Sequence, residues 1–216
     1  GLRAVSYDLV VSWKHKQTLS NVAADDTNLL RGVTFAQGLF VAVGHKIFTS
    51  ETGETWSRRT HPLDDSQWLG DVKYGNGRFV ASGGYGYSAF SLDGRSWERG
   101  GDHGTEAMRS LAFGNGVFMG RTDPGNWWST ENGETWTLDS GGHNEDIAFC
   151  EGAFKNESNC PAVEGEGVYL RAGGWDSGHV QRSEDGQTWT NVFVGYVGSI
   201  TGIAFGYTAG DGDESA

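Results

Sequence analysis

The chain has 216 residues and a formal net charge of −12, with 16 Lys and Arg against 28 Asp and Glu. This balance disfavours nucleic acid as a partner, because phosphate contacts need clustered basic side chains. Gly is abundant at 35 residues, Pro is rare at 3 and Trp is frequent at 9, a composition typical of an all-β protein with many tight turns. No apolar stretch reaches the roughly 18 residues of a membrane span.

Apolar strand patterns recur along the chain. Residues 4–13 predict strands without a turn motif of their own. From residue 33 onward, two strands separated by a short turn recur, and turns such as Asn76-Gly77 between apolar runs are a strong hairpin signal. The first strand of each pair contains residues 33–35, 72–74, 111–113 and 147–149, and the second contains residues 39–43, 78–82, 117–120 and 168–172.

A turn motif follows each pair, with Ser or Thr first, then Gly, then Trp at a fixed spacing. Its copies are Ser50 to Trp56, Ser91 to Trp97, Thr130 to Trp136 and Ser183 to Trp189. The tryptophans lie 41, 39 and 53 residues apart. A period of about 40 residues with strand-like flanks is typical of a radial or stacked array of small sheets. Each repeat therefore predicts a four-stranded antiparallel unit.

The motif residues have the chemistry of a turn. Gly supplies the positive φ, Asp or Asn and the hydroxyls accept backbone amides, and Trp enters the fourth strand to fill the space between neighbouring sheets. Thr52 replaces Asp in the first copy, so that turn is expected to be weaker. We assign this structural role to Ser50, Gly53, Trp56, Ser91, Asp93, Gly94, Trp97, Thr130, Asn132, Gly133, Trp136, Ser183, Asp185, Gly186 and Trp189.

An insertion of about residues 151–166 interrupts the fourth repeat and explains the 53-residue spacing. Cys150 and Cys160 flank most of this segment, and a disulfide closing so short a loop would stabilise the fold by about 3 kcal/mol. The pair predicts an oxidising compartment, so we expect a secreted protein, extracellular or periplasmic. Asn156 fits the acceptor pattern for N-glycosylation, and whether it is modified stays open.

A fifth first-strand pattern occurs at residues 203–207, with no turn motif after it. Pairing this strand with the N-terminal strands would close a ring and hide the sheet edges. The sequence thus predicts an all-β fold, a five-bladed β-propeller of four-stranded antiparallel blades with one blade closed by both termini. We expect a single domain over residues 1–209 and a disordered acidic tail over residues 210–216.

The turn motif resembles the Asp box of the BNR-repeat, sialidase-like β-propellers, a group that includes sialidases, sortilin-type receptors, photosystem assembly factors and several lectins. The resemblance covers residues 33–207. The usual box has one more residue between Ser and Gly, a spacing that only Ser129 to Gly133 keeps here. In that group the box lies on the turn between the third and fourth strands, away from the binding face. The resemblance therefore implies the fold and not an activity.

Sialidase activity is not expected. In the group that this chain resembles, active sialidases have a six-bladed ring, an Arg triad, a Tyr/Glu pair and an Arg-Ile-Pro motif. No Arg-Ile-Pro occurs among the prolines Pro62, Pro124 and Pro161. The predicted ring is also one blade short.

Candidate ligand residues lie in the loops expected on the face opposite the Asp boxes. Connections between second and third strands cover residues 44–46, 83–87, 123–128 and 173–179, and those between one repeat and the next cover residues 61–68, 101–106 and 141–146. Among the aromatic side chains in these loops, Tyr85, Trp127 and Trp175 are the candidate platforms for a ligand. Among the histidines, the candidates are His61, His103 and His143, with the carboxylates Glu106 and Asp146 nearby in sequence.

Three interpretations of these loops compete. They are solvated polar loops, or a glycan-binding face with aromatic platforms, or a metal or acid/base centre of His and carboxylate groups. We favour a non-catalytic extracellular binding module that binds carbohydrate through this face, its partner being a glycan or a protein ligand. The alternative is a glycoside hydrolase or lyase with a His/carboxylate centre on the ring axis. No cofactor is expected, and a bound divalent cation is left open.

Overall fold

The structure is a computed structural model, and it describes residues 4–5, 14–15, 29–64, 66–123, 125–141, 144–150, 167–173 and 178–194. Its strands form four four-stranded antiparallel sheets, each a meander in chain order, which we call blades 1 to 4. Two further strands, β1 (Ala4–Val5) and β2 (Lys14–His15), pair with each other. The four repeats of the sequence thus correspond to four sheets, and the all-β prediction is confirmed.

The blades take their strands from the predicted segments. Blade 1 comprises β3 (Leu30–Ala36), β4 (Leu39–Gly44), β5 (Ile47–Ser50) and β6 (Ser57–Arg59). Blade 2 comprises β7 (Leu69–Gly75), β8 (Arg78–Gly83), β9 (Ser88–Ser91) and β10 (Glu98–Arg99), with a 3₁₀ turn at Gly84–Gly86. Blade 3 comprises β11 (Met108–Gly114), β12 (Val117–Thr122), β13 (Asn126–Thr130) and β14 (Thr137–Gly141). Blade 4 comprises β15 (Asn144–Cys150), β16 (Val168–Gly173), β17 (His179–Ser183) and β18 (Thr190–Val194).

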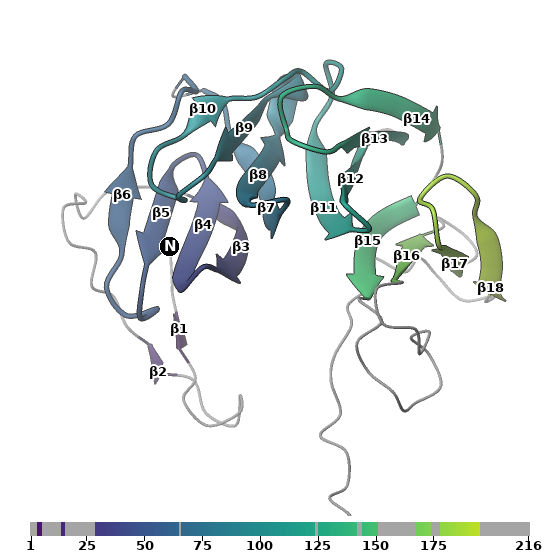
Figure 1. The fold of residues 1–216 in the computed structure, drawn as a ribbon, viewed down its shortest axis with the longest axis horizontal. Coiled ribbons are helices and arrows are strands. Elements are labelled where there is room, and N and C mark those ends of the chain that lie inside the picture. The colour runs from purple at the N-terminus through teal and green to yellow at the C-terminus, as the bar shows by residue number, and fades with distance from the viewer. Residues whose placement is uncertain are drawn as a thin grey trace, which may run out of the picture.

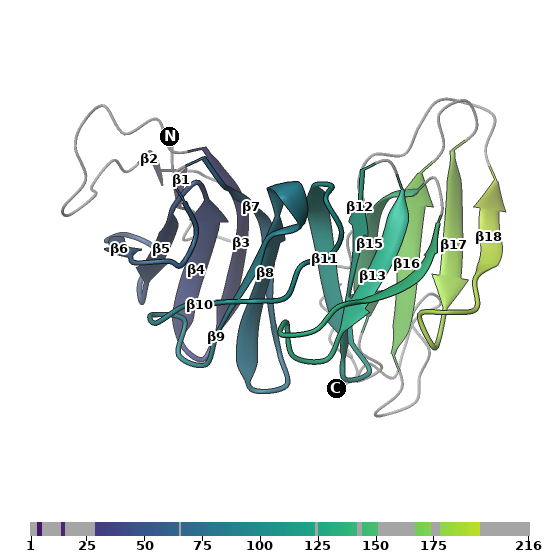
Figure 2. The same ribbon diagram turned by 90° about the horizontal axis from the view of Figure 1, so that it is seen from above.

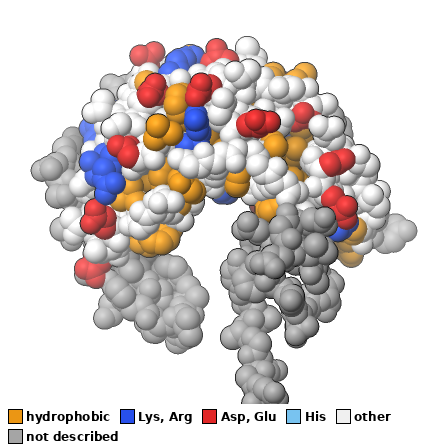
Figure 3. All heavy atoms as spheres, viewed as in Figure 1, with side chains coloured by type: hydrophobic (Ala, Val, Ile, Leu, Met, Phe, Trp, Pro, Cys, Tyr) orange, Lys and Arg blue, Asp and Glu red, His pale blue; other side chains and the backbone are white. Residues whose placement is uncertain are grey.

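The blades lie side by side along an arc that is open on one side (Figure 1). The first strand of each blade lies on the inside of the arc and the fourth on the outside, and the same succession of blades is seen from above (Figure 2). The inner strands of successive blades touch, β3 against β7, β7 against β11 and β11 against β15. On the face shown in Figure 3, acidic and basic side chains are intermixed along the arc.

Every first strand carries a bulge at the same place. The register against the second strand shifts between Leu30 and Gly32 in blade 1 and between Met108 and Ser110 in blade 3, and blades 2 and 4 repeat the shift. A bulge leaves one extra residue unpaired and re-aims its side chain. In blades 1 and 3 that residue is an arginine, Arg31 and Arg109 respectively.

Hairpin asparagines tie blade 2 to blade 3 and blade 3 to blade 4. Asn76 sits in the turn between β7 and β8 with a φ of 48°, the left-handed conformation that a tight hairpin requires. Its side-chain amide donates to the carbonyl oxygens of Gly116 at 2.6 Å and Glu131 at 2.8 Å in blade 3. Asn115 likewise donates to the carbonyl oxygen of Glu184 in blade 4 at 2.8 Å.

Apolar side chains fill the space between neighbouring blades. Each blade has a front face, toward the preceding blade, and a back face, toward the following one. At the blade 1–blade 2 interface, Val41 and Ile47 lie on the back face of blade 1 and pack with Val72, Phe79 and Trp97 on the front face of blade 2. The blade 2–blade 3 interface contains Val80, Met108, Leu111, Phe118 and Trp136, and the blade 3–blade 4 interface contains Ala112, Met119, Trp127, Ile147 and Tyr169.

Among the described residues, the front face of blade 1 has no blade against it. Val33 is 59% exposed there, whereas Val72, Leu111 and Ile147, at the same register position in the later blades, are 0%, 0% and 4% exposed. At the other end of the arc, Phe193 on the back face of blade 4 is 53% exposed. The front face of blade 1 is exposed only in part, because Ala42, Phe48 and Trp56 on the same face are 3%, 0% and 9% exposed.

The described residues thus form four blades, and the predicted fifth blade is not among them. Residues 203–207 lie outside the described residues, as do most of the N-terminal residues that were expected to pair with them. The described part of the N-terminal segment, β1 and β2, forms a sheet of its own. The 151–166 insertion and the 210–216 tail also lie outside the described residues.

Candidate ligand-binding face

The connections of the blades separate into two faces of the molecule. Backbone hydrogen bonds join the loops between second and third strands to the loops between blades, as from Gly86 N–H to the Glu106 carbonyl at 2.9 Å. We call this the loop face, formed by residues 45–46, 60–64, 66–68, 84–87, 100–107, 123 and 125. The hairpin of Asn76 and the turn of Glu131 meet on the opposite side, which we call the turn face.

The repeated turn motifs lie on the turn face, where their side chains bond to their own backbone. In blade 2, Ser91 Oγ accepts the Gly94 N–H at 2.8 Å, and Asp93 Oδ1 accepts the N–H groups of Arg95 and Ser96 at 2.7 Å each. These donors, that of Ser96 foremost, hold the pKa of Asp93 at about 2. In the first copy Thr52 Oγ1 accepts a single N–H at 3.2 Å, from Glu54. The motif carboxylates are therefore occupied within their turns.

Tyr85 is the exposed aromatic residue of the loop face. Its side chain is 67% exposed, and its backbone has a φ of 57° and a ψ of 31°, a left-handed conformation that costs a non-glycine residue free energy. Hydrogen bonds from Gly84 N–H to the Trp68 carbonyl and from Tyr87 N–H to the Gly84 carbonyl hold the turn in place. Strain that is maintained by its surroundings is a pointer to a functional position.

Trp68 is packed against the same turn, and the sequence analysis did not single it out. A Cβ on Gly84 would lie 2.6 Å from the Trp68 indole, so only glycine lets the two approach so closely. The guanidinium of Arg31 lies 4.2 Å from the Trp68 ring centroid and that of Arg109 lies 5.4 Å from it, which are cation–π contacts. Both arginines are the bulged residues of their strands, so the bulges aim them at one indole.

This arrangement places charged groups of both signs beside an aromatic surface. Arg109 Nε donates to Asp123 Oδ2 at 2.9 Å, and Arg31 has no carboxylate within ion-pair distance among the described residues. Trp68 remains partly exposed and Tyr85 is open to solvent. We call Arg31, Trp68, Tyr85, Arg109 and Asp123 the aromatic–arginine cluster. It offers a flat apolar surface, donors and an acceptor on the loop face.

Trp127 does not lie on the loop face, which corrects its expected role. The structure starts β13 at Asn126, so Trp127 belongs to a strand and points toward blade 4. It is 1% exposed and stacks on Trp189, with ring centroids 6.1 Å apart and planes at 29°. Arg171 covers both rings, at 5.1 Å from Trp127 and 3.9 Å from Trp189. Trp127 is therefore part of the blade 3–blade 4 interface. Trp175 lies outside the described residues.

The predicted histidines lie in unlike environments. His103 is fully buried, with Nε2 3.0 Å from the Tyr87 carbonyl and its ring edge-on to Trp136, and burial lowers its pKa. His61 lines a cavity on the loop side of blade 1, where its Nδ1 accepts the Leu63 N–H at 3.3 Å. His143 lies outside the described residues. The structure therefore does not bring His61 and His103 together as a pair.

The two predicted carboxylates make contacts within the fold. Glu106 Oε2 accepts the Thr122 hydroxyl at 3.2 Å. Asp146 lies in β15, where it accepts the hydroxyl of Ser110 from β11 and the N–H of Ile147. It thereby joins the inner strands of blades 3 and 4. Within the described ranges, no three His, Cys, Asp or Glu side chains gather closely enough to hold a metal ion.

No protein-family model matches the sequence, and no curated protein matches it. Solved structures are similar in fold. The computationally designed Ika8 protein is 15% identical with a TM-score of 0.57, over 90% of this chain and 57% of that one. The YCF48 structure bound to D1 peptide is 21% identical with a TM-score of 0.55, over 76% of this chain and 55% of that one. YCF48 from Cyanidioschyzon merolae is 13% identical with a TM-score of 0.55, over 92% of this chain and 75% of that one.

These likenesses and the arc of four-stranded blades define a β-propeller fold. The chain spans 57% of the designed protein and 55% of the peptide-bound YCF48 chain, so it corresponds to little more than half the length of either. Within the described ranges no helix has the length and apolar character to cross a membrane. At identities this low the likeness concerns the fold alone, and the loop face has to be interpreted from its own residues.

Proposed function

We propose that the protein is a non-catalytic binding module that binds carbohydrate through the loop face. The observation that carries this proposal is the exposed Tyr85, with its strained backbone, within the aromatic–arginine cluster. Sugar rings present apolar faces that stack on aromatic rings, and their hydroxyls need donors and acceptors nearby. Arg31, Arg109 and Asp123 supply such groups. The turn around Tyr85 is held by its own backbone bonds, so little ordering entropy would be lost on binding.

Two rival functions have weaker support. A peptide is the second candidate ligand, because one neighbour of similar fold is YCF48 bound to D1 peptide. A glycoside hydrolase or lyase would use the histidines with Glu106 or Asp146. His103 is buried, and Asp146 is bonded to Ser110, so this rival lacks an assembled acid/base pair among the described residues.

Binding to a glycan array at neutral pH, with and without Ca²⁺, tests the proposal. Tyr85→Ala is expected to weaken glycan binding by roughly 1–3 kcal/mol, as for other aromatic anchors, and Tyr85→Phe is expected to retain most of it because the ring remains. The dissociation constants of the wild-type protein and the two variants give the comparison.

Leu92→Ala is the matched control for Tyr85→Ala. Leu92 is equally exposed, at 67%, but lies in the Asp-box turn on the opposite face. Its replacement is expected to leave glycan binding unchanged. If no glycan binds, if the array selects a peptide ligand instead, or if Leu92→Ala and Tyr85→Ala have equal effects, the carbohydrate proposal is wrong. Turnover of a glycan that depends on His61 or His103 would favour the enzyme.

We further propose that the fold is an Asp-box, BNR-type propeller in which residues 203–207 and the N-terminal segment complete a fifth blade. Its support is the repeated turn motif together with exposed apolar residues, Val33 and Phe35 on the front face of blade 1 and Phe193 on the back face of blade 4. Apolar faces of this kind are buried at the three interfaces inside the chain. A composite blade would bury both.

Secretion into an oxidising compartment is a third proposal, with Cys150 bonded to Cys160. The support is the spacing of the two cysteines, because Cys160 lies outside the described residues. Thiol titration of the unfolded, unreduced protein is expected to find no free thiol. Two free thiols would remove the main support for secretion.

A further inference from the structure

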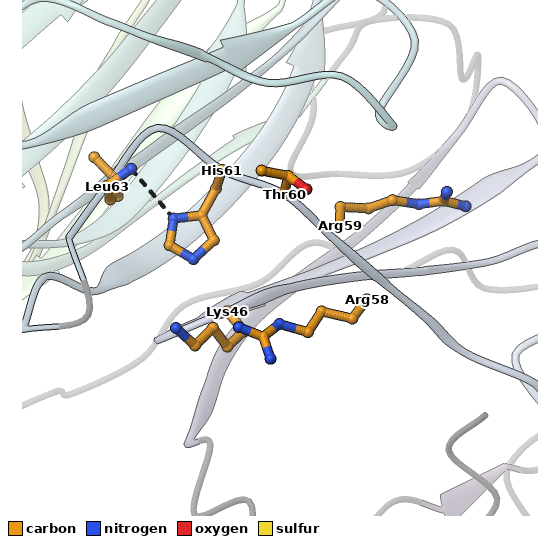
Figure 4. A pocket seen from close by; sticks show the side chains of 6 residues that line it. All are labelled: Lys46, Arg58, Arg59, Thr60, His61 and Leu63. Carbon is orange, nitrogen blue, oxygen red and sulfur yellow. Dashed lines mark hydrogen bonds between the residues drawn. The ribbon is translucent and has the colours of Figure 1, made fainter. Parts of the chain in front are cut away.

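A cavity of about 340 Å³ lies at the loop-face end of blade 1 (Figure 4). It is lined by Lys46, Arg58, Arg59, Thr60, His61 and Leu63. This volume is at the lower end of the range for small-ligand sites and would take one ring or one ionic group. Lys46 comes from the β4–β5 loop, Arg58 and Arg59 come from the end of β6, and the other lining residues come from the segment after β6.

The charged residues that line the cavity are all basic, although the chain as a whole has a net negative charge. Lys46, Arg58 and Arg59 carry positive charge, His61 and Thr60 add polar groups, and none of the lining residues is acidic. The whole chain has 28 acidic against 16 basic residues, so a cavity with this lining departs from the charge balance of the protein. A lining with these charges attracts an anion.

The side chains differ in how they are placed. Figure 4 shows Lys46 and Arg58 extending on the same side of the cavity, with the His61 ring beside them, while Arg59 points away. Arg59 Nε donates to Thr49 Oγ1 at 2.7 Å, which explains its direction. Because His61 Nδ1 accepts the Leu63 N–H, a neutral His61 ring carries its proton on Nε2 and is a donor there.

We propose that this cavity binds a tetrahedral oxyanion, a sulfate or phosphate ester group carried by the ligand, with Lys46 and Arg58 as its principal charged contacts. An ammonium and a guanidinium together provide point charge and directed donors, the combination that recognises such groups. This inference rests on the proposed function in one respect: the anion would belong to an acidic sugar bound on the loop face.

Calorimetric titration with inorganic sulfate and inorganic phosphate tests the cavity without any sugar. The wild-type chain is expected to bind at least one of them saturably, with a dissociation constant of about 10 mM or tighter. The double variant Lys46→Gln/Arg58→Gln is expected to raise that constant at least roughly tenfold, with a folded circular dichroism spectrum. Arg95→Gln is the matched control, because Arg95 is a basic residue of the turn face paired with Glu51.

Binding of sulfated, phosphorylated and neutral forms of one glycan is then compared. The comparison shows which ester group the cavity binds, and it tests the anion site separately from the proposed function. Loss of inorganic anion binding in the double variant supports the cavity even if no glycan binds. Glycan binding that requires Tyr85, but is unchanged by either ester group and by the Lys46→Gln/Arg58→Gln substitutions, overturns the proposed anion site and leaves the proposed function intact. Absence of saturable sulfate and phosphate binding, or an equal effect of Arg95→Gln, also overturns it.

Discussion

Replacing Trp127 by alanine is expected to lower the free energy of unfolding by about 3–5 kcal/mol, the usual cost of removing a large buried aromatic side chain. Trp127 is 1% exposed and fills the blade 3–blade 4 interface against Trp189. The substitution would also remove one of the two rings under the Arg171 guanidinium, whose Nη1 is buried without a hydrogen-bond partner. Leaving a buried cation with less contact adds to the cost. Urea unfolding followed by tryptophan fluorescence and circular dichroism measures the loss.

Tyr85→Ala is the comparison for Trp127→Ala, because it removes an aromatic ring that is 67% exposed. Its effect on stability is expected to be within about 0.5 kcal/mol, as for most surface substitutions. The two variants therefore separate stability from binding. A stable Trp127→Ala protein with reduced glycan binding would mean that Trp127 is a ligand platform after all.

Replacing Val72 by alanine is expected to cost about 2 kcal/mol, from the loss of two buried methyl groups and the cavity that they leave. Val72 is 0% exposed between blades 1 and 2. Val33→Ala makes the same chemical change at the equivalent position of blade 1, where the side chain is 59% exposed. Denaturant unfolding of the two variants, at equal protein concentration, compares a closed interface with the front face of blade 1.

The Val33 result decides whether the ring closes. A composite fifth blade predicts that Val33→Ala costs about as much as Val72→Ala, because that blade would cover the front face of blade 1. A cost below about 0.5 kcal/mol would mean that Val33 stays in solvent, and the proposed closure would be wrong. Repeating the measurement at several protein concentrations reveals whether a second copy of the chain covers the face instead, since the cost would then depend on concentration.

The blades were predictable because local chemistry specifies them. Asn76-Gly77 sets a hairpin, the alternation from Val72 to Tyr74 sets a strand, and Gly94 with Trp97 sets the next turn and strand. These signals act over a few residues, so they can be read along the chain. The number of blades depends instead on which residues cover Val33 and Phe193, which are far apart in sequence. No local sequence pattern determines which residues those are.

The site was less predictable because a shift of one residue in the start of a short strand sends each side chain to the opposite face. The sequence analysis placed Trp127 in an exposed loop. In the structure, β13 starts at Asn126, so Trp127 is a strand residue that packs in the blade 3–blade 4 interface. Period-two alternation also sends Trp128 to the opposite face, where it packs with the blade 2–blade 3 interface. The sequence does contain a signal for the two arginines around Trp68, which the sequence analysis did not use. Arg31 and Arg109 each lie two residues before the central apolar residue of a first strand, so aligning the repeats would have paired them.

The interface between blades recurs more faithfully than any single blade. Each of the three interfaces among the described residues joins a back face to a front face that carries a turn-motif tryptophan, and the hairpin asparagines Asn76 and Asn115 reach across two of them. Deleting or duplicating one whole repeat would therefore bring together faces that already fit. A gene encoding such a protein can gain or lose blades by unequal recombination without redesigning a contact.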